Sequence, residues 1–266
     1  MNIYAIVLAA GKGTRMKSDL PKVAHEVLYK PMIKHVCDEL KKIDVTQTIV
    51  VLGHKAEVVK NIMQDEVTYV MQEEQLGTGH AVKMAYDLLK DKEGITLVLN
   101  GDAPLIRKKT LEALIKTHVD NENKATLMSA HCDTKFPFGR IVRNEQGNVL
   151  GIVEAKDATP EQLQITEMNT GEYCFDNQLL FDALTKVNNN NAQNEYYLTD
   201  VIEILGKVNY KVGSYVIDDF DEVGGINDRV QLANAQKKMQ ERINTELLLK
   251  GVTLVDPSNT YVARDI

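Results

Sequence analysis

"IYAIVLAAGKGTRMKSDLPK", residues 3–22, joins a short apolar run to a loop rich in glycine and basic side chains. The apolar run over residues 3–8 has the length and composition of a buried β-strand. From Leu8 to Lys22 the sequence holds two glycines and four basic side chains. Loops at the C-terminal ends of strands form the ligand crevice of open α/β sheets. The stretch therefore predicts a strand followed by an anion-binding loop.

Apolar runs alternate with helical patterns through the first half of the chain. The runs are short and nearly continuous, as in strands that are buried on both faces. The predicted strands are residues 3–8, 48–52, 67–71 and 95–99, and the predicted helices are residues 32–42, 55–64 and 79–90. This β-α-β-α order predicts a parallel, doubly wound sheet.

The second half has a different pattern. Residues 138–156 hold two strand-like runs around the turn "NEQGN", which predicts a β-hairpin. The remaining predicted elements are strands 171–175 and 212–217 and helices 176–187, 197–206 and 228–249. The expected fold class is α/β, with a mixed, mainly parallel sheet and a substrate-side β-hairpin insertion.

Composition restricts the function. The net charge of −7 argues against a nucleic-acid-binding face, which needs a basic stripe. The three cysteines lie far apart without a metal-binding pair, which fits buried thiols in a reducing cytoplasm. The N-terminus has no signal-peptide pattern, and no apolar run approaches the roughly 20 residues that span a bilayer. We expect a cytoplasmic location without membrane contact.

The first loop fits neither common phosphate-binding motif. The NTPase loop needs G-x-x-x-x-G-K-[ST], and the residues after Gly11 do not follow it. The dinucleotide fingerprint needs a third glycine where Met16 stands, and an acidic residue where the second strand ends at Gly53. The loop must bind its anion in another way, or be a solvated basic turn.

The physical chemistry of the loop still favours phosphate. Gly11 and Gly13 can adopt positive φ and let backbone N–H groups approach phosphate oxygens. Arg15 and Lys22 can add charge-assisted hydrogen bonds.

The stretch A-A-G-x-G-T-R-M followed by Pro21-Lys22 resembles the signature of sugar-nucleotide pyrophosphorylases. Six more segments resemble the uridylyltransferase domain of the bacterial bifunctional enzymes that make UDP-N-acetylglucosamine. They are QEEQLGTGHAV (72–82), NGDAPLI (100–106), FGRIVR (138–143), GIVEAKDAT (151–159), EMNTGEYCF (167–175) and NNNAQNEYYLTD (189–200). The resemblance runs in order from residue 3 to about residue 256.

The resemblance implies a Rossmann-like nucleotidyltransferase fold and a Mg²⁺-dependent reaction. UTP and N-acetylglucosamine 1-phosphate would give UDP-N-acetylglucosamine and pyrophosphate, for peptidoglycan and other cell-envelope polysaccharides. The attacking oxygen belongs to the sugar phosphate and is already anionic, so the reaction requires no general base. We expect direct in-line attack on the α-phosphorus, with positioning and charge neutralisation as the main contributions of the protein.

Four residues carry the implied chemistry. Arg15 and Lys22 would neutralise the triphosphate and the departing pyrophosphate. Asp102 and Asn227 match the metal ligands of the family, and Mg²⁺ prefers such oxygen ligands. Each has a structural alternative: Asp102 can start a turn, and Asn227 can cap the following helix unless Asp228 does so.

The other implied site residues contact the two substrates. Gln72 is expected to pair with uracil as both donor and acceptor, whereas His80 is expected to make only a structural hydrogen bond. Glu154 could instead be a surface carboxylate, and Asn169 a turn residue. The full implied substrate-binding set is Leu8, Ala9, Ala10, Gly11, Lys22, Gln72, Gly77, Thr78, Asn100, Gly101, Asp102, Gly139, Glu154, Asn169, Thr170 and Asn227.

The sequence departs from the family at two places. Asn100 stands where the family has a tyrosine, which affects the sugar contact. The family's second half, an acetyltransferase β-helix of hexapeptide repeats, has no counterpart here, because the last residues are too few to stack such coils.

The expected organisation is a nucleotidyltransferase domain over residues 1–227, a linker helix over 228–250 and the start of the β-helix over 251–266. The helix should stop at Gly251, and the tail, with its strand-like pieces, should be mobile after Pro257. Because the family trimerises through the β-helix, we expect mainly monomer.

Two other functions remain open. The chain could be a related nucleotidyltransferase with another base or sugar. It could also be a non-catalytic nucleotide-sugar sensor, although the presence of Arg15, Lys22, Asp102 and Asn227 argues against a sensor.

Overall fold

Nine strands pair into one sheet within residues 1–264, which are the residues that this computed structural model describes. The main path of the sheet has the order β11-β7-β10-β6-β1-β4-β5. Its strands are β1 (Ile3–Ala9), β4 (Gln47–Leu52), β5 (Thr68–Met71), β6 (Ile95–Asn100), β7 (Ala125–His131), β10 (Glu167–Asp176) and β11 (Val212–Val216). The predicted strands are confirmed in place, and 171–175 is part of the longer β10.

The sheet is mixed and mainly parallel, as the sequence predicts. β1 pairs in parallel with both β4 and β6, and β5 continues the parallel set beyond β4. β10 runs antiparallel to β6 and to β7, whereas β11 is parallel to β7. The register of β1 with β6 places Leu8 beside Asn100 at the C-terminal ends of both strands.

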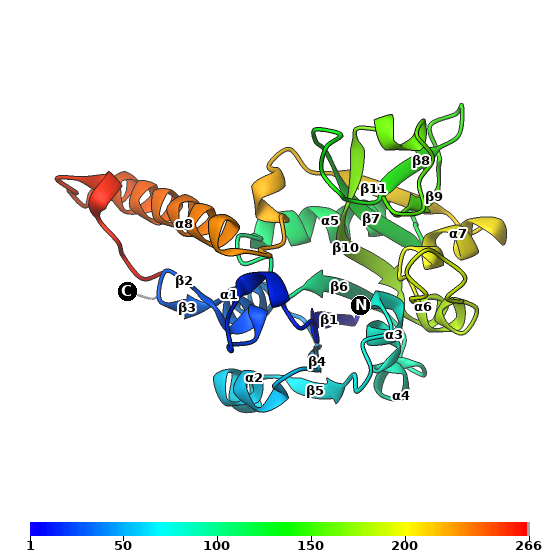
Figure 1. Cartoon of the computed structure of the whole chain (residues 1–266), viewed down its shortest axis with the longest axis horizontal. Coiled ribbons are helices and arrows are strands. Elements are labelled where there is room, and N and C mark those ends of the chain that lie inside the picture. The colour runs from blue at the N-terminus through cyan, green and yellow to red at the C-terminus, as the bar shows by residue number, and fades with distance from the viewer. Residues whose placement is uncertain (265–266) are drawn as a thin grey trace.

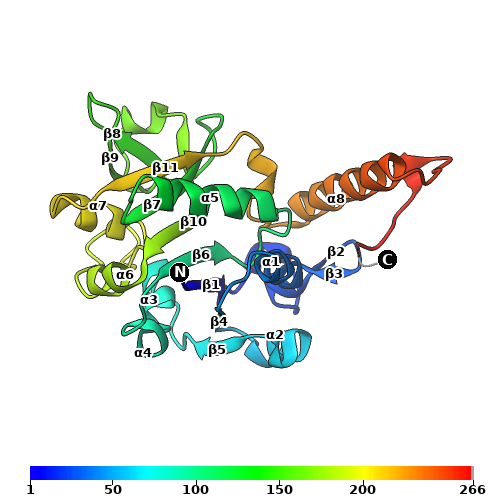
Figure 2. The same cartoon turned by 180° about the vertical axis from the view of Figure 1, so that it is seen from behind.

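Helices cover both faces of the sheet because its central strands are apolar on both sides. On β1, Tyr4 and Ile6 join one core and Ala5, Val7 and Ala9 join the other. The first core includes residues of α3, α6 and α7, and the second includes residues of α1, α2 and α5 (Figures 1 and 2). The helix bounds are α1 (Met32–Lys41), α2 (Ala56–Met63), α3 (Thr78–Lys83), α4 (Tyr86–Leu89), α5 (Lys108–Asp120), α6 (Asn177–Leu184) and α7 (Asp200–Lys207).

The predicted helix over residues 79–90 is two helices. Met84 and Ala85 donate their N–H groups three residues back, to Ala81 and Val82, at 3.2 and 3.0 Å. This tighter turn separates α3 from α4.

The predicted hairpin is confirmed as β8 (Arg140–Arg143) and β9 (Val149–Val153), which pair in antiparallel fashion. Its turn is held by Asn144, whose Oδ1 accepts the N–H groups of Gln146 and Asn148 at 3.1 and 2.9 Å. β8 also pairs with β10 through Arg140 and Met168. The hairpin therefore extends from the sheet next to the strand that carries Asn169 and Thr170.

The long helix α8 (Arg229–Leu249) projects from the body of the molecule (Figure 1). Asp228 caps its first turn, because its Oδ1 accepts the N–H of Gln231 at 2.8 Å. Val252 and Gly251 donate to the carbonyls of Leu247 and Leu248, both at 3.0 Å, which is a Schellman ending. The stop at Gly251 is confirmed.

The apolar stripe of α8 packs against the segment that follows the first loop. That stripe and its partners form a third hydrophobic cluster, separate from the two cores of the sheet. The α8 members are Leu232, Ala235, Met239 and Ile243, with Leu247 at the edge, and they pack with Met16, Val27, Leu28 and Met32.

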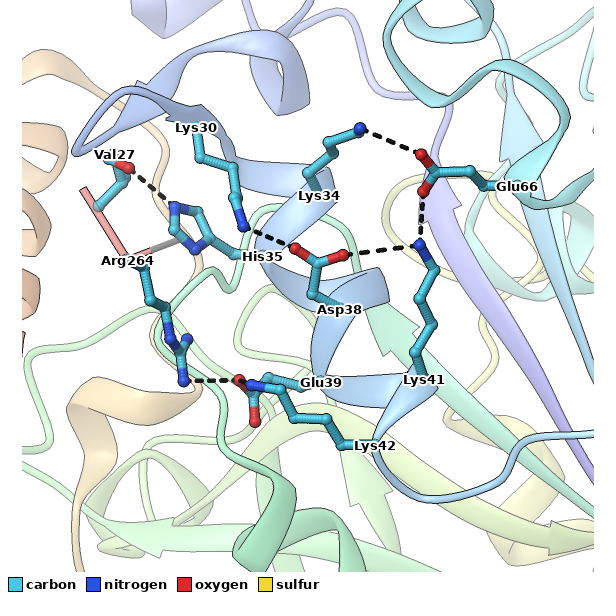
Figure 3. A network of polar contacts seen from close by, with 10 residues as sticks. All are labelled: Val27, Lys30, Lys34, His35, Asp38, Glu39, Lys41, Lys42, Glu66 and Arg264. Atoms are coloured by element: carbon cyan, nitrogen blue, oxygen red, sulfur yellow. Dashed lines mark hydrogen bonds and ion pairs between the residues drawn. The ribbon is translucent and has the colours of Figure 1, made fainter. Parts of the chain in front are cut away.

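The tail after α8 is bonded to the body of the molecule, and the mobility that the sequence predicts after Pro257 stays a prediction. Gln240 and Asn244, both buried on α8, donate to the carbonyl of Thr260 at 2.9 and 2.8 Å. Arg264 then forms an ion pair with Glu39 on α1 at 2.7 Å (Figure 3). The strand-like pieces are not strands: residues 252–264 hold only a 3-10 turn, Pro257–Asn259.

Glu39 joins three parts of the chain. Its side chain is 2 % exposed, and Oε2 accepts the N–H of Lys108 at the start of α5 at 2.7 Å. Oε1 receives Lys42 at 2.6 Å and Arg264 at 2.7 Å (Figure 3). One carboxylate thus connects α1, α5 and the tail.

Two of the three cysteines are buried, as the composition analysis expects. Cys37 and Cys174 are buried, and burial raises the pKa of the Cys37 thiol to about 12. Cys132 is only half-buried, because it follows the last residue of β7. Over residues 1–264, none of the helices combines the length and the apolar composition that crossing a bilayer requires.

Candidate active site

Two adjoining cavities open at the C-terminal ends of β1 and β6 and share Leu8, Thr78, Asn100 and Asp102. The first, about 270 Å³, lies against the glycine-rich loop and is here called the loop compartment. The second, about 250 Å³, lies between β10 and the β8–β9 hairpin and is called the hairpin compartment. This is the edge at which open α/β sheets bind ligands.

Most of the predicted site residues line these compartments. The loop compartment contains Ala9, Ala10, Gly11, Lys22, Gln72 and Gly77 beside the shared residues. The hairpin compartment contains Gly139, Glu154, Asn169, Thr170 and Asn227 beside the shared residues.

Two predicted residues do not line either cavity. Gly101 donates its N–H to the carbonyl of Leu8 at 3.0 Å, a backbone hydrogen bond that links the end of β6 to β1. Arg15 stands at the rim, where its Nη2 donates to Asn227 Oδ1 at 2.9 Å.

Cationic and oxygen-bearing side chains converge where the compartments meet. Lys22 forms an ion pair with Asp102 and donates to Asn227 Oδ1 at 3.0 Å. Asp102 follows the end of β6, Lys22 follows the first loop, and Asn227 precedes α8. Segments far apart in sequence therefore supply one charged centre.

Comparison with known proteins fits this geometry. The sequence profile described as nucleotidyl transferase matches residues 4–239. The chain belongs to the nucleotidyl transferase family. It is 51 % identical to the bifunctional protein GlmU of Streptococcus mutans serotype c (strain ATCC 700610 / UA159) over 266 residues, which is 100 % of this chain and 58 % of the relative.

Two further relatives are similar to the chain at nearly the same level of identity. GlmU of Staphylococcus carnosus (strain TM300) is 52 % identical, and GlmU of Exiguobacterium sibiricum (strain DSM 17290 / CCUG 55495 / CIP 109462 / JCM 13490 / 255-15) is 50 % identical. Each match covers the whole chain and 59 % of the relative. The nucleotidyl transferase thus spans less than two thirds of the length of these relatives.

The first loop of this nucleotidyl transferase is shaped by one glycine in the left-handed region. Gly13 has φ of 61°, and a Cβ there would lie 2.7 Å from the Cβ of Lys22. The close approach brings the loop onto Lys22. Gly11 was expected to share this conformation and does not, because its φ lies outside the left-handed region.

Gln72 has only part of the hydrogen-bonding capacity that the sequence predicts. Its Nε2 donates to the carbonyl of Gly77 at 3.1 Å and to His80 Nδ1 at 3.0 Å. Both donors are used inside the protein, so Oε1 is left as an acceptor toward a ligand. The pairing of Gln72 with a base as donor and acceptor stays a prediction, for which this structure leaves Oε1 available. The hydrogen bond expected of His80 is confirmed.

Glu154 faces the hairpin compartment instead of forming the surface carboxylate considered above. Thr199 donates to its Oε1 at 3.3 Å. Burial raises the pKa of Glu154, and the carboxylates of Asp157, Asp200 and Glu195 add to the rise. Burial also raises the pKa of Asp200 to about 6. Glu154 therefore offers an acceptor for hydroxyl groups on the wall of the hairpin compartment.

Asn169 lies in β10 and is not a turn residue. Its Nδ2 donates to the hydroxyl of Tyr173 at 2.7 Å. The neighbouring Thr170 donates its hydroxyl to the carbonyl of Met128 at 2.9 Å. These bonds fix two polar side chains on the wall of the hairpin compartment.

The donor set at the charged centre suits a hard divalent cation. Asp102 offers a carboxylate and Asn227 an amide oxygen, and the Lys22 ammonium contacts both. Asp228 caps α8, so the Oδ1 of Asn227 is not consumed as a cap. Over residues 1–264 no group of three or more His, Cys, Asp or Glu side chains forms a ligand cluster. That pattern fits Mg²⁺, which takes one or two protein oxygens plus phosphates and water.

Sequence reasoning missed several residues that line the cleft. Glu195 and Thr199 belong to the motif NNNAQNEYYLTD, which was recognised without assigning roles to them. Gln75 and Phe138 likewise lie inside recognised segments. Their positions in those motifs were the available signal. Glu172, which lies behind the cleft, likewise belongs to the recognised segment EMNTGEYCF.

Proposed function

We propose that this chain transfers uridylyl from UTP to N-acetylglucosamine 1-phosphate, releasing pyrophosphate and giving UDP-N-acetylglucosamine. The observation that supports this most is the convergence of Lys22, Asp102 and Asn227 where the two compartments meet. A nucleotide in the loop compartment and a sugar phosphate in the hairpin compartment would join their phosphates there. The product would supply peptidoglycan and other envelope polysaccharides.

The chain's own residues contribute charge and position. Lys22 and Arg15 would neutralise the triphosphate and the pyrophosphate as it leaves, which favours the transition state. Gln72 Oε1 would accept from the N3–H of uracil, and Glu154 would accept from sugar hydroxyls. The sugar phosphate is an anionic nucleophile, so in-line attack on the α-phosphorus needs no base. No histidine is needed for the chemistry.

Asp102 and Asn227 would hold Mg²⁺. The ion, when bound, would supply charge neutralisation for the phosphate oxygens. Lys22 would then turn from these two oxygens to the phosphates, since its ammonium and the ion compete for the same ligands.

The decisive experiment measures pyrophosphate release by the purified chain. The reaction holds UTP with or without N-acetylglucosamine 1-phosphate, and with Mg²⁺ or a chelator. We expect release only when all three components are present. Parallel reactions with TTP and GTP, and with glucose 1-phosphate, test the related nucleotidyltransferases. Equal rates with another pair would replace the proposed substrates, and no release with any pair would favour the sensor.

A further inference from the structure

The sheet buries one carboxylate directly behind the hairpin compartment. Glu172 lies on β10 between Gly171 and Tyr173, both of which line that compartment, and is itself 0 % exposed. Burying a carboxyl group is costly unless hydrogen bonds compensate. A carboxylate at this position therefore calls for an explanation beyond packing.

A bulge in β10 turns Glu172 inward. Asn169 pairs with Ser129 of β7, and Tyr173 pairs with Leu127. Residues 170–172 of β10 therefore face only Met128, and the strand bends to accommodate them. Gly171 adopts φ of 92° at the centre of this bulge.

Glu172 is bonded to the residue that replaces the family's tyrosine. Asn100 Nδ2 donates to Glu172 Oε1 at 3.1 Å and to the carbonyl of Gly171 at 3.4 Å. The carbonyl can only accept, so the amide nitrogen must face β10 and Oδ1 must face away from it. Glu172 Oε2 has no hydrogen-bond partner.

We propose that Glu172 is a positioning residue that fixes the Asn100 amide against β10 and leaves its Oδ1 in the cleft as an acceptor for the sugar phosphate. Asn100 then determines specificity, because a fixed acceptor selects a sugar 1-phosphate that offers an O–H or N–H donor at that point. The assignment rests on the proposed function and deepens it by naming the group that reads one face of the sugar.

The anchoring ties the Asn100 amide to the strand that borders the sugar side of the cleft. Asn100 borders both compartments, but both groups that hold its amide come from the bulge of β10. The bulge neighbours Asn169, Thr170 and Gly171 line only the hairpin compartment. The amide is therefore fixed to the wall of the sugar side.

The charge state of Glu172 is compatible with a phosphate substrate. Burial raises the pKa of Glu172 to about 8, and the nearby Asp102 carboxylate contributes to the rise. A neutral carboxyl still accepts from Asn100 through its carbonyl oxygen. It does so without placing a second negative charge beside the site of attack.

The test is a double-mutant cycle on the full 266-residue chain. Glu172→Met keeps the length of the side chain and removes the acceptor, and Asn100→Ala removes the amide. One hydrogen bond contributes about 0.5–1.5 kcal/mol, so each variant should raise KM for the sugar phosphate roughly three- to tenfold. KM for UTP should stay within about twofold. If Glu172 acts through Asn100, KM for the sugar phosphate should be no higher in the double variant than in Asn100→Ala.

Rescue separates positioning from a merely structural role. Glu172→Gln retains an acceptor oxygen and should recover most of the KM that Glu172→Met loses. Melting temperatures of all variants accompany the kinetics. Additive effects in the double variant, or a change in KM for UTP alone, would overturn the proposal. Calorimetric binding of N-acetylglucosamine 1-phosphate gives the same comparison without turnover.

A panel of sugar analogues identifies the donor. N-acetylglucosamine 1-phosphate is compared with analogues that each lack one hydroxyl, or that carry an ester in place of the amide N–H. One analogue should be penalised in the wild type and should lose that penalty in Asn100→Ala. An unchanged pattern in Asn100→Ala would show that Asn100 reads no donor. Absence of pyrophosphate release by the wild type, in contrast, would refute the proposed function itself.

Discussion

Lys22 Nζ lies 3.0 Å from Asn227 Oδ1, although 205 residues separate the two in the chain. Lys22 follows the loop after the first strand, and Asn227 immediately precedes the cap of α8. The contact closes the cleft between the first and the last parts of the nucleotidyltransferase core. The charged centre is thus assembled only when the whole chain has folded.

Asp102→Asn should lower the rate of pyrophosphate release by at least about 100-fold, because it replaces a charged oxygen ligand by a neutral one of similar volume. Rates are measured by pyrophosphate release over a Mg²⁺ titration, and the Mg²⁺ needed for half-maximal rate should rise. Asp87→Asn, at an exposed acid on α4, is the matched control. Wild-type turnover at low Mg²⁺ would show that Asp102 is not the ligand.

Lys22→Ala should reduce kcat more than it weakens uridine-nucleotide binding, because the ammonium faces phosphates. Removing a comparable donor costs roughly 2.7–4 kcal/mol of barrier. Lys12→Ala alters an exposed lysine of the same loop and should retain activity. The role assigned to Lys22 fails if both variants turn over equally fast.

Asn100→Tyr should leave the Mg²⁺ dependence intact and change mainly KM for the sugar phosphate. The substitution exchanges an amide that is bonded to Glu172 for a phenol. Steady-state kinetics with each substrate varied in turn provide the check. A shift in KM for UTP without one for the sugar would place Asn100 on the nucleotide side.

His118 makes the stability of the fold sensitive to acid. The buried His118 Nδ1 is hydrogen-bonded to Thr126 Oγ1 at 3.0 Å, and the same oxygen accepts from Asn123 Nδ2 at 3.0 Å. Burial lowers the pKa of His118 to about 4, Asp176 partly offsets this shift, and Lys124 adds to it. The unfolded chain therefore takes up this proton first, and the free energy of unfolding should fall as pH drops from about 6.5 to 4.

The expected slope from His118 is roughly 1 kcal/mol per pH unit in that window. Urea unfolding at a series of pH values measures it. His118→Gln keeps a polar group but cannot take up the proton, so its curve should be flatter by this amount. Parallel curves for the two proteins would assign the acid sensitivity to other groups.

Glu39→Ala should destabilise the fold by about 2–3 kcal/mol, because it removes the acceptor of the Lys108 N–H and the partner of two partly exposed cations, Lys42 and Arg264. Arg264→Ala should cost about 1 kcal/mol, since Glu39 keeps Lys42 and the N–H of Lys108. Urea unfolding ranks the variants. Lys60→Ala, from the exposed pair with Glu57, should change stability little. A larger loss of stability in Arg264→Ala than in Glu39→Ala would contradict the inference that Glu39 connects α1, α5 and the tail.

Much of the fold follows from local patterns. Continuous apolar runs predicted β1, β4, β5 and β6, and the turn around Asn144 predicted the hairpin. α5 and β7 were not predicted, although "TLEALIKTHV" has helical spacing and "ATLMSA" reads as a strand. The prediction of a single helix over residues 79–90 was wrong, because nothing in the apolar spacing indicates the tight turn at Ala85.

The site, too, could be predicted only in part from the sequence. Motifs located Lys22, Asp102 and Asn227, and the structure brings them together. Glu172 stands in the recognised segment EMNTGEYCF, but the motif did not indicate its burial, because a glutamate in a strand is ordinarily solvated. Its burial depends on a bulge that arises when β10 pairs with both β6 and β7. Likewise, the tail's attachment depends on Glu39, which lies in a distant helix.

The Arg264–Glu39 ion pair also sets how mechanical load enters the molecule. Tension applied along the tail reaches α1 first, through Glu39, and the bonds from Gln240 and Asn244 to Thr260 share it with α8. Asn227 stands at the opposite end of α8, beyond the clustered side chains of Leu232 and Met239. The tail is thus bonded to α1 and to the C-terminal half of α8, at the end of that helix away from Asn227.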